Sequence, residues 1–124
     1  MAVFFKTTNP SALLRAFNDR IEQDDQKGKI TTWEQHKQDG TMYYTHKAAE
    51  WHKEAYFKAV IRDNILQFNI VRPQKKNISV LIYGYYHGHL IETFLNHFDT
   101  FFSEAVASSN AVDGDNVSGA ENDR

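Results

Sequence analysis

The sequence contains no cysteine, which excludes disulfide bonds, thiolate metal sites and a cysteine nucleophile. It also lacks any apolar run near the roughly 20 residues that a helix needs to cross a bilayer. The first eleven residues carry one lysine after a short apolar opening, which is too little for a secretory signal. From these absences we expect a cytoplasmic protein that does not enter a membrane.

The motifs that usually mark nucleotide binding and catalysis are missing as well. There is no G-x-G-x-x-G, no G-x-x-x-x-G-K-[ST] and no G-x-S-x-G in the chain. Six histidines are present, but their spacing does not bring three or four ligands together as a zinc site requires. We therefore predict no catalytic residues, no metal and no other cofactor, and we expect that the chain is not an enzyme.

Length and charge divide the chain into a body and a tail. The 124 residues, 41% of them hydrophobic and 14% aromatic, fit one compact domain. Residues 27–76 hold ten lysines and arginines against five acids, whereas residues 108–124 hold four acids, one base and no aromatic residue. The sequence thus predicts a single domain over residues 1–107 and a disordered acidic tail over residues 108–124.

Two helices are predicted near the ends of the body. Asn9 followed by Pro10 is typical of a helix start, because an asparagine caps free N–H groups and proline lacks one. Apolar residues then recur at helical spacing until Gly28 provides a stop. A second apolar stripe, from about Gly88 to Ala105, predicts a well-buried C-terminal helix. Residues 2–5 are either a short strand or an apolar lead-in to the first helix.

Between the helices the apolar period shifts towards two, which predicts strands. Asp39-Gly40 is a strong signal for a two-residue hairpin turn, so we place strands at 30–38 and 41–48. A second turn at Asp63-Asn64 pairs apolar residues on one face of the sheet and leaves the other face mostly polar; the expected pairs are Phe57 with Ile70, Ala59 with Phe68, and Ile61 with Leu66.

Two further segments have competing interpretations or unusual composition. Residues 47–59 contain good helix formers, but their partial alternation favours a strand. Residues 78–86 are rich in β-branched and aromatic residues and are interpreted as the last, central strand, with Gly84 at a bulge. The expected fold is α+β: an antiparallel meander of four to five strands, with the N-terminal and C-terminal helices on one face.

The solvent face of this sheet is the main candidate for binding. Its alternating positions combine aromatic rings with cations, a combination suited to protein hot spots and also to stacking on nucleic-acid bases. We therefore interpret the chain as a small binding or regulatory protein of the inhibitor, immunity or adaptor kind. Its expected partner is another protein or a second copy of the chain itself. The predicted binding residues are Tyr43, Tyr56, Lys58, Arg62, Tyr83 and Tyr85.

Two alternatives remain open. Single-stranded nucleic acid is the less favoured partner, because the sequence pI is about 6.3 and no RNA-recognition string is present. A small-molecule or metal-dependent enzyme is the other alternative. It would use residues 83–89, where we expect the last strand to meet the last helix, and its candidate residues are His87 and His89.

Overall fold

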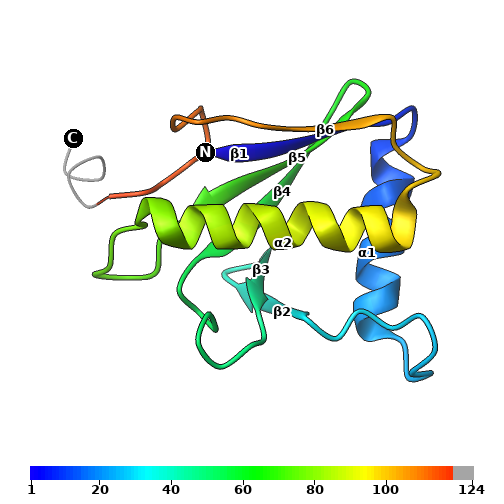
Figure 1. The fold of residues 1–124 in the computed structure, drawn as a ribbon, viewed down its shortest axis with the longest axis horizontal. Helices are drawn as coiled ribbons and strands as arrows, with labels where there is room; N and C mark the ends of the chain where they lie inside the picture. Colours follow the sequence, from blue (N-terminus) through cyan, green and yellow to red (C-terminus); the bar gives the residue numbers. More distant parts are fainter. Residues whose placement is uncertain (119–124) are drawn as a thin grey trace.

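The structure, a computed structural model, describes residues 1–118, which form an α+β fold with one antiparallel sheet (Figure 1). The strands lie in the order β2-β3-β4-β5-β1-β6. Along this part of the chain the elements are β1 (Ala2–Lys6), α1 (Pro10–Glu22), β2 (Trp33–Gln38), β3 (Thr41–His46), β4 (Tyr56–Arg62), β5 (Ile65–Val71), α2 (Val80–Phe98) and β6 (Glu104–Ala107).

Both predicted hairpins are confirmed. Asp39 and Gly40 have φ angles of 52° and 80°, as a turn with two left-handed residues requires. In the second hairpin Arg62 pairs with Ile65, and the predicted register holds along the strands, with the pairs Phe57–Ile70, Ala59–Phe68 and Ile61–Leu66. The four strands β2 to β5 are therefore the predicted meander, and β1 and β6 extend it at one side to six strands.

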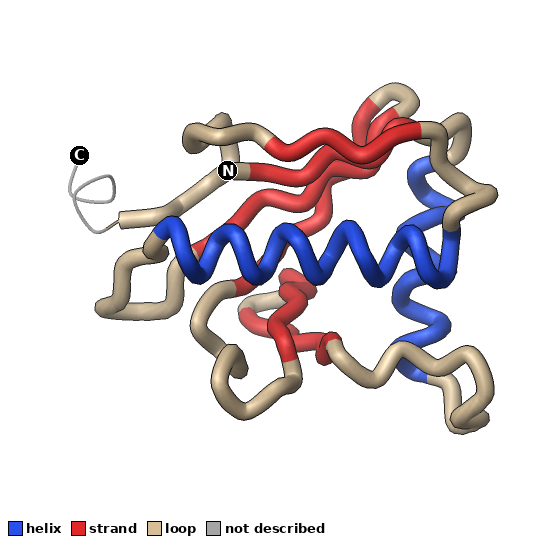
Figure 2. Tube along the Cα trace, viewed as in Figure 1, coloured by secondary structure: helices blue, strands red, loops and turns tan. Residues whose placement is uncertain are grey.

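Both helices pack on the same face of the sheet (Figures 1 and 2). The side chain of Asn9 caps α1 by accepting a hydrogen bond from the backbone N–H of Ala12, as predicted. Phe17 of α1 and Phe94 of α2 meet with ring centroids 5.0 Å apart, and both also contact Phe68 of β5. We call this helix-covered side the inner face and the opposite side the outer face.

The strand predicted over residues 78–86 is wrong, because α2 already begins at Val80. The hydroxyl of Ser79 caps it and accepts a hydrogen bond from the N–H of Ile82. Local composition favours a strand here, but the burial period is helical, and the buried residues of α2 lie three or four positions apart along one side: Tyr83, Tyr86, Leu90, Phe94 and Phe98. Gly84 is consequently an exposed helix residue and not a bulge.

Residues 47–55 form a loop, so the strand preferred over 47–59 is correct only from Tyr56 onward. The alternation breaks at Lys53, whose φ of 60° does not fit a strand. Thr45 fixes the loop instead: its hydroxyl accepts a hydrogen bond from the N–H of Lys53 and donates one to the carbonyl of Ala55.

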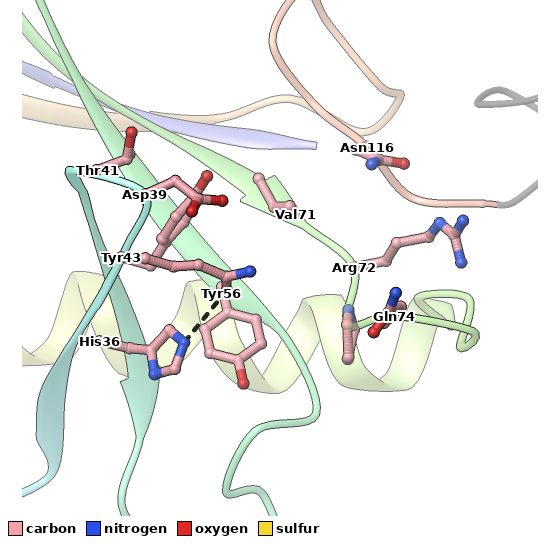
Figure 3. A pocket seen from close by; sticks show the side chains of 11 residues that line it. His36, Asp39, Thr41, Tyr43, Tyr56, Val71, Arg72, Gln74 and Asn116 are labelled. Atoms are coloured by element: carbon pink, nitrogen blue, oxygen red, sulfur yellow. Dashed lines mark hydrogen bonds between the residues drawn. The ribbon is translucent and has the colours of Figure 1, made fainter.

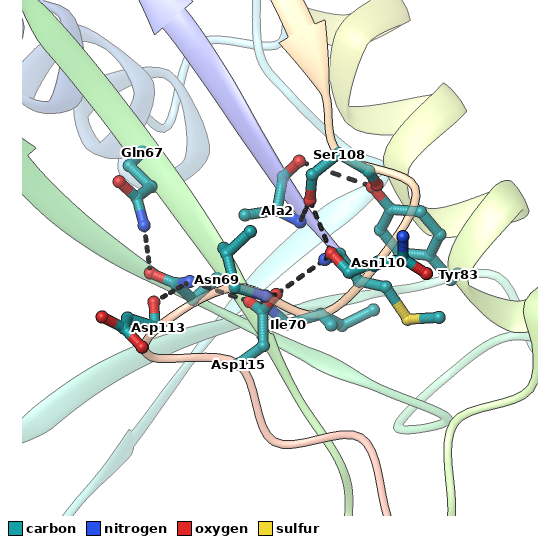
Figure 4. Close-up of polar contacts among 11 residues, drawn as sticks. Ala2, Gln67, Asn69, Ile70, Tyr83, Ser108, Asn110, Asp113 and Asp115 are labelled. Carbon is teal, nitrogen blue, oxygen red and sulfur yellow. Dashed lines mark hydrogen bonds and ion pairs between the residues drawn. The ribbon is translucent and has the colours of Figure 1, made fainter.

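The described part of the predicted tail, residues 108–118, packs against the sheet, and the disorder predicted for it is wrong (Figure 4). Because β1 pairs with β5 only as far as Asn69, the backbone of β5 beyond that residue lacks a strand partner on this side. Asn116 takes the place of such a strand. Its backbone N–H donates to the carbonyl of Ile70 at 2.9 Å, and its carbonyl accepts from the N–H of Arg72 at 2.7 Å. Residues 119–124 of the predicted tail lie outside the described residues.

Asp115 anchors this segment, and its side chain has no exposed surface. One carboxylate oxygen accepts hydrogen bonds from the amide of Asn69 at 2.8 Å and the N–H of Ile70 at 3.1 Å. The other oxygen accepts from the N–H of Val112 at 2.8 Å and forms an ion pair with the Met1 ammonium at 2.7 Å. Charge-assisted hydrogen bonds of this kind offset the entropy that ordering the segment costs.

We predict that Asp115→Ala lowers the free energy of unfolding by about 3 kcal/mol, because it leaves several buried donors without an acceptor. Chemical denaturation measures the change. Asp113→Ala is the matched control, since Asp113 is exposed and uses only its backbone carbonyl towards Asn69. Equal stabilities for the two variants would show that the segment is not anchored through Asp115.

Candidate functional site

Four of the predicted binding residues lie on the outer face of the sheet. Tyr44 and Phe57 are buried on the inner face and pair with each other, so their chain neighbours alternate to the opposite side. Tyr43 and Lys58 are directly opposite each other in the next pair of the same ladder. The residues that the strands place there are Tyr43, Tyr56, Lys58 and Arg62.

The outer face contains a pocket of about 540 Å³ (Figure 3). One wall comes from the β2–β3 hairpin and the start of β4, and the other from the chain after β5 together with Asn116 of the C-terminal segment. The size falls within the range of pockets that hold small molecules or anchoring side chains of a partner. It is lined by His36, Gln38, Asp39, Thr41, Tyr43, Tyr56, Val71, Arg72, Pro73, Gln74 and Asn116.

Tyr56 is the centre of an aromatic group in this pocket. Its ring centroid lies 5.2 Å from that of His36 and 6.3 Å from that of Tyr43, the latter in an edge-to-face arrangement. Burial, followed by the charges of Tyr86 and Glu34, raises the pKa of the Tyr56 phenol. The hydroxyl therefore stays protonated at neutral pH and is available as a hydrogen-bond donor.

The charged residues around this aromatic group are mostly basic. Lys58 is exposed and lies between Tyr43 and Asn69 in the pairing across the sheet. The guanidinium of Arg62 donates to the side-chain carbonyl of Gln67 at 2.9 Å, which holds its charge at the same face. The nearby acid Glu34 is engaged with His52 at 2.5 Å. The face thus offers rings, hydrogen-bond donors and positive charge.

Tyr83 and Tyr85 are not on the outer face, so their predicted placement on the solvent side of the sheet is wrong. Both belong to α2, which covers the inner face. The Tyr83 hydroxyl is buried and donates to the carbonyl of Ser108 at 2.8 Å, and burial raises its pKa to about 12. Tyr85 stacks on Trp51 with ring centroids 3.8 Å apart and so fixes the 47–55 loop.

His87 and His89 also lie within α2, so the predicted strand–helix junction does not exist at residues 83–89. The two side chains make separate contacts: His87 stacks on Tyr83, and His89 stacks on Tyr85 and approaches His46. They do not converge on a shared polar group. The geometry on which the enzyme alternative depended is therefore absent from this position.

His46 and His89 form a pair with defined proton positions. The N–H of Ala48 donates to Nδ1 of His46 at 3.0 Å, so the proton of the neutral His46 ring is on Nε2. That Nε2 lies 3.3 Å from Nδ1 of His89 and donates to it. Burial, and then the charge of His89, lowers the pKa of His46 to about 4.

Two residues that line the pocket could not be predicted from the sequence. Arg72 and Asn116 both lie on the wall opposite His36 and Tyr56 (Figure 3), and they are neighbours only because the C-terminal segment returns to β5. No local pattern at either residue indicates that return. His36, by contrast, follows from strand alternation once Tyr43 is placed, because the two are direct partners in the β2–β3 hairpin.

Within residues 1–118 no group of three or more histidines, cysteines, aspartates or glutamates is arranged to hold a metal ion. None of the helices described for these residues is both long enough and apolar enough to span a membrane. Comparison with protein-family models, curated proteins and solved structures finds no significant match to this chain. The functional inference therefore depends on the geometry of the outer face.

We predict that the fold loses about 3 kcal/mol of stability through His46 as the pH falls from about 7 to about 4. The unfolded chain takes up this proton near pH 6.5, whereas the folded chain resists it until its pKa of about 4. Stability from the neutral ring is thus present above pH 6.5 and is lost below it.

Denaturation at a series of pH values measures this effect. His46→Asn keeps an acceptor near Nδ1 but cannot be protonated, so its stability should fall less steeply than that of the wild type. His36→Asn, which removes a half-buried ring from the outer face, is the control and should keep the wild-type slope. Identical slopes for wild type and His46→Asn would contradict the assignment.

Proposed function

We propose that the chain is a non-catalytic binding protein that takes a protein partner on its outer sheet face. The observation that supports this most is the pocket around Tyr56, on the face that neither helix covers among the described residues. Inhibitors, immunity-type proteins and adaptors act in this way. The lack of cysteine is in keeping with a cytoplasmic location, which we include in the proposal.

The packing of the aromatic group favours tight binding. His36, Tyr43 and Tyr56 already contact one another, so docking a partner against them costs little side-chain entropy. Tyrosine and arginine are enriched among the residues that dominate binding energy at protein interfaces. The pocket therefore suits an aromatic or other planar side chain of the partner that stacks beside the Tyr56 ring and forms hydrogen bonds with the polar residues lining the rest of the pocket.

The charges describe the rest of the partner surface. Lys58 and Arg62 lie along the same strand, on the same face as the pocket. Complementary charge at the rim of an interface raises the association rate and selects among partners. We infer that the partner carries acidic residues around the side chain that enters the pocket.

Single-stranded nucleic acid is the second candidate, and one observation favours it. A tyrosine ring next to exposed lysine on a sheet is also the arrangement on which unpaired bases stack. The formal net charge of -2 at pH 7 weighs against it, because binding to nucleic acid depends on an excess of positive charge. A protein partner and a nucleic acid would use the same residues of the outer face, so one set of variants tests both candidates.

A photo-crosslinking amino acid in place of Tyr56 tests the protein partner directly in the host cell. We expect a discrete protein adduct from this position, and we expect Lys58→Glu in the same chain to abolish it. The same amino acid in place of Leu81 is the control, because Leu81 is 71% exposed on α2, away from the outer face. Equal adducts from both positions would contradict the proposal.

Once the adduct identifies the partner, the affinity between the chain and this partner tests the role of the Tyr56 ring. Tyr56→Ala is expected to raise the dissociation constant at least about tenfold, whereas Tyr56→Phe keeps the ring and most of the affinity. In parallel, a labelled oligothymidine is titrated at low salt. Tight binding that falls steeply with salt and is weakened by Tyr56→Ala would replace the protein partner with nucleic acid.

A further inference from the structure

The two edges of the sheet differ in how they are protected. β2 forms one edge and is polar along its length after Trp33, with charged side chains and a hydrogen bond between Glu34 and His52. β6 forms the other edge, and its sequence, EAVA, contains one charge and no proline. Its Val106 is 51% exposed. Natural sheets usually protect free edges with charges, proline or bulges, or by keeping the edge strand very short, and β6 has only its short length and one charge.

The backbone of β6 leaves hydrogen-bonding groups free along this edge. Just after β1, the N–H of Thr7 donates to the carbonyl of Asn64 beside β5. The carbonyl of Ala2 instead accepts a hydrogen bond from the N–H of Ser108 just after β6. The backbone N–H and C=O groups of the even-numbered residues of β1 therefore point towards β6. In the antiparallel ladder these even residues pair with Glu104 and Val106. The N–H and C=O groups of Ala105 and Ala107 therefore point outward, and within residues 1–118 no strand pairs with them.

We propose that this edge binds the β6 strand of a second copy of the chain, antiparallel and around a two-fold axis at Val106. In that register each Ala105 pairs with Ala107 of the second copy, and each pair exchanges two hydrogen bonds. Val106 lies opposite Val106 of the second copy on the outer face, and Glu104 lies opposite Ser108. An isologous contact of this kind closes after two copies.

Neighbouring registers fit less well. A centre at Ala105 requires the N–H of Ser103, which already donates to the carbonyl of Lys6 at 2.8 Å. A centre at Ala107 pairs Ala105 with Ser109, beyond the end of β6, and places Val106 opposite a serine. The centre at Val106 is the register that uses both free alanines and covers the exposed valine with another apolar side chain.

The partner's chemistry follows from the edge itself. The occupying strand must be short, with small residues on the inner side and an apolar residue on the outer side, and β6 has this pattern. Pairing of two copies joins their sheets edge to edge and places both outer faces on the same side. Because only a short strand takes part, we expect a dissociation constant in the micromolar range. This dimer does not depend on the proposed function.

Sedimentation of the full chain over a range of concentrations tests the proposal. The wild type is expected to form dimers, and Val106→Lys is expected to raise the dimer dissociation constant at least tenfold, because two lysines would face each other. Leu81→Lys introduces the same charge at another exposed apolar residue and should leave the dimer unchanged. A monomer throughout, or a dimer that Val106→Lys does not weaken, would overturn the proposal.

The register has its own test, because the chain contains no other cysteine. Val106→Cys should form a covalent dimer on mild oxidation, since directly opposed residues of a non-hydrogen-bonded pair approach closely enough for a disulfide. Leu81→Cys is the control and should form far less. Comparable covalent dimer from both positions would exclude the β6 contact, and circular dichroism of each variant confirms that it is folded.

Discussion

The packing around Phe94 is the interaction on which the rest of the structure depends. Its ring stacks on Phe5 of β1 at 4.2 Å and meets Phe17 of α1 at 5.0 Å and Phe68 of β5 at 5.6 Å. One side chain thus joins both helices to the two adjacent strands at the centre of the core. Since burial of aromatic surface dominates core energetics, both helices are held on the inner face. The outer face is left to the polar and aromatic residues that alternate with this core.

Parts of the fold that depend on local chemistry could be predicted from the sequence. The Asp39-Gly40 turn and the Asn9 cap are decided by residues next to one another in the chain, and both are as predicted. The start of α2 was missed because residues 78–86 have the composition of a strand. Their helical burial is decided by contacts such as those of Tyr86 with the distant Trp33 and Phe57, which local composition does not contain.

The candidate site divides in the same way. Tyr43, Tyr56, Lys58 and Arg62 follow from strand alternation in hairpins whose turns are recognisable, whereas Tyr83 and Tyr85 were misplaced together with α2. The far wall of the pocket could not be foreseen. Asn116 reaches it because Asp115 is bound by Asn69, Ile70 and Val112, and the return of this acidic segment has no signature in its polar composition.

The central claim is that covering one face of the sheet with both helices leaves the other face to bind. Amide spectra of the isotopically labelled chain, recorded with increasing amounts of its isolated partner, test it most directly. The account predicts that the perturbed amides lie around Tyr43, Tyr56 and Lys58 on the outer face. Perturbations centred on the exposed side of α2, with the strand signals unchanged, would contradict it.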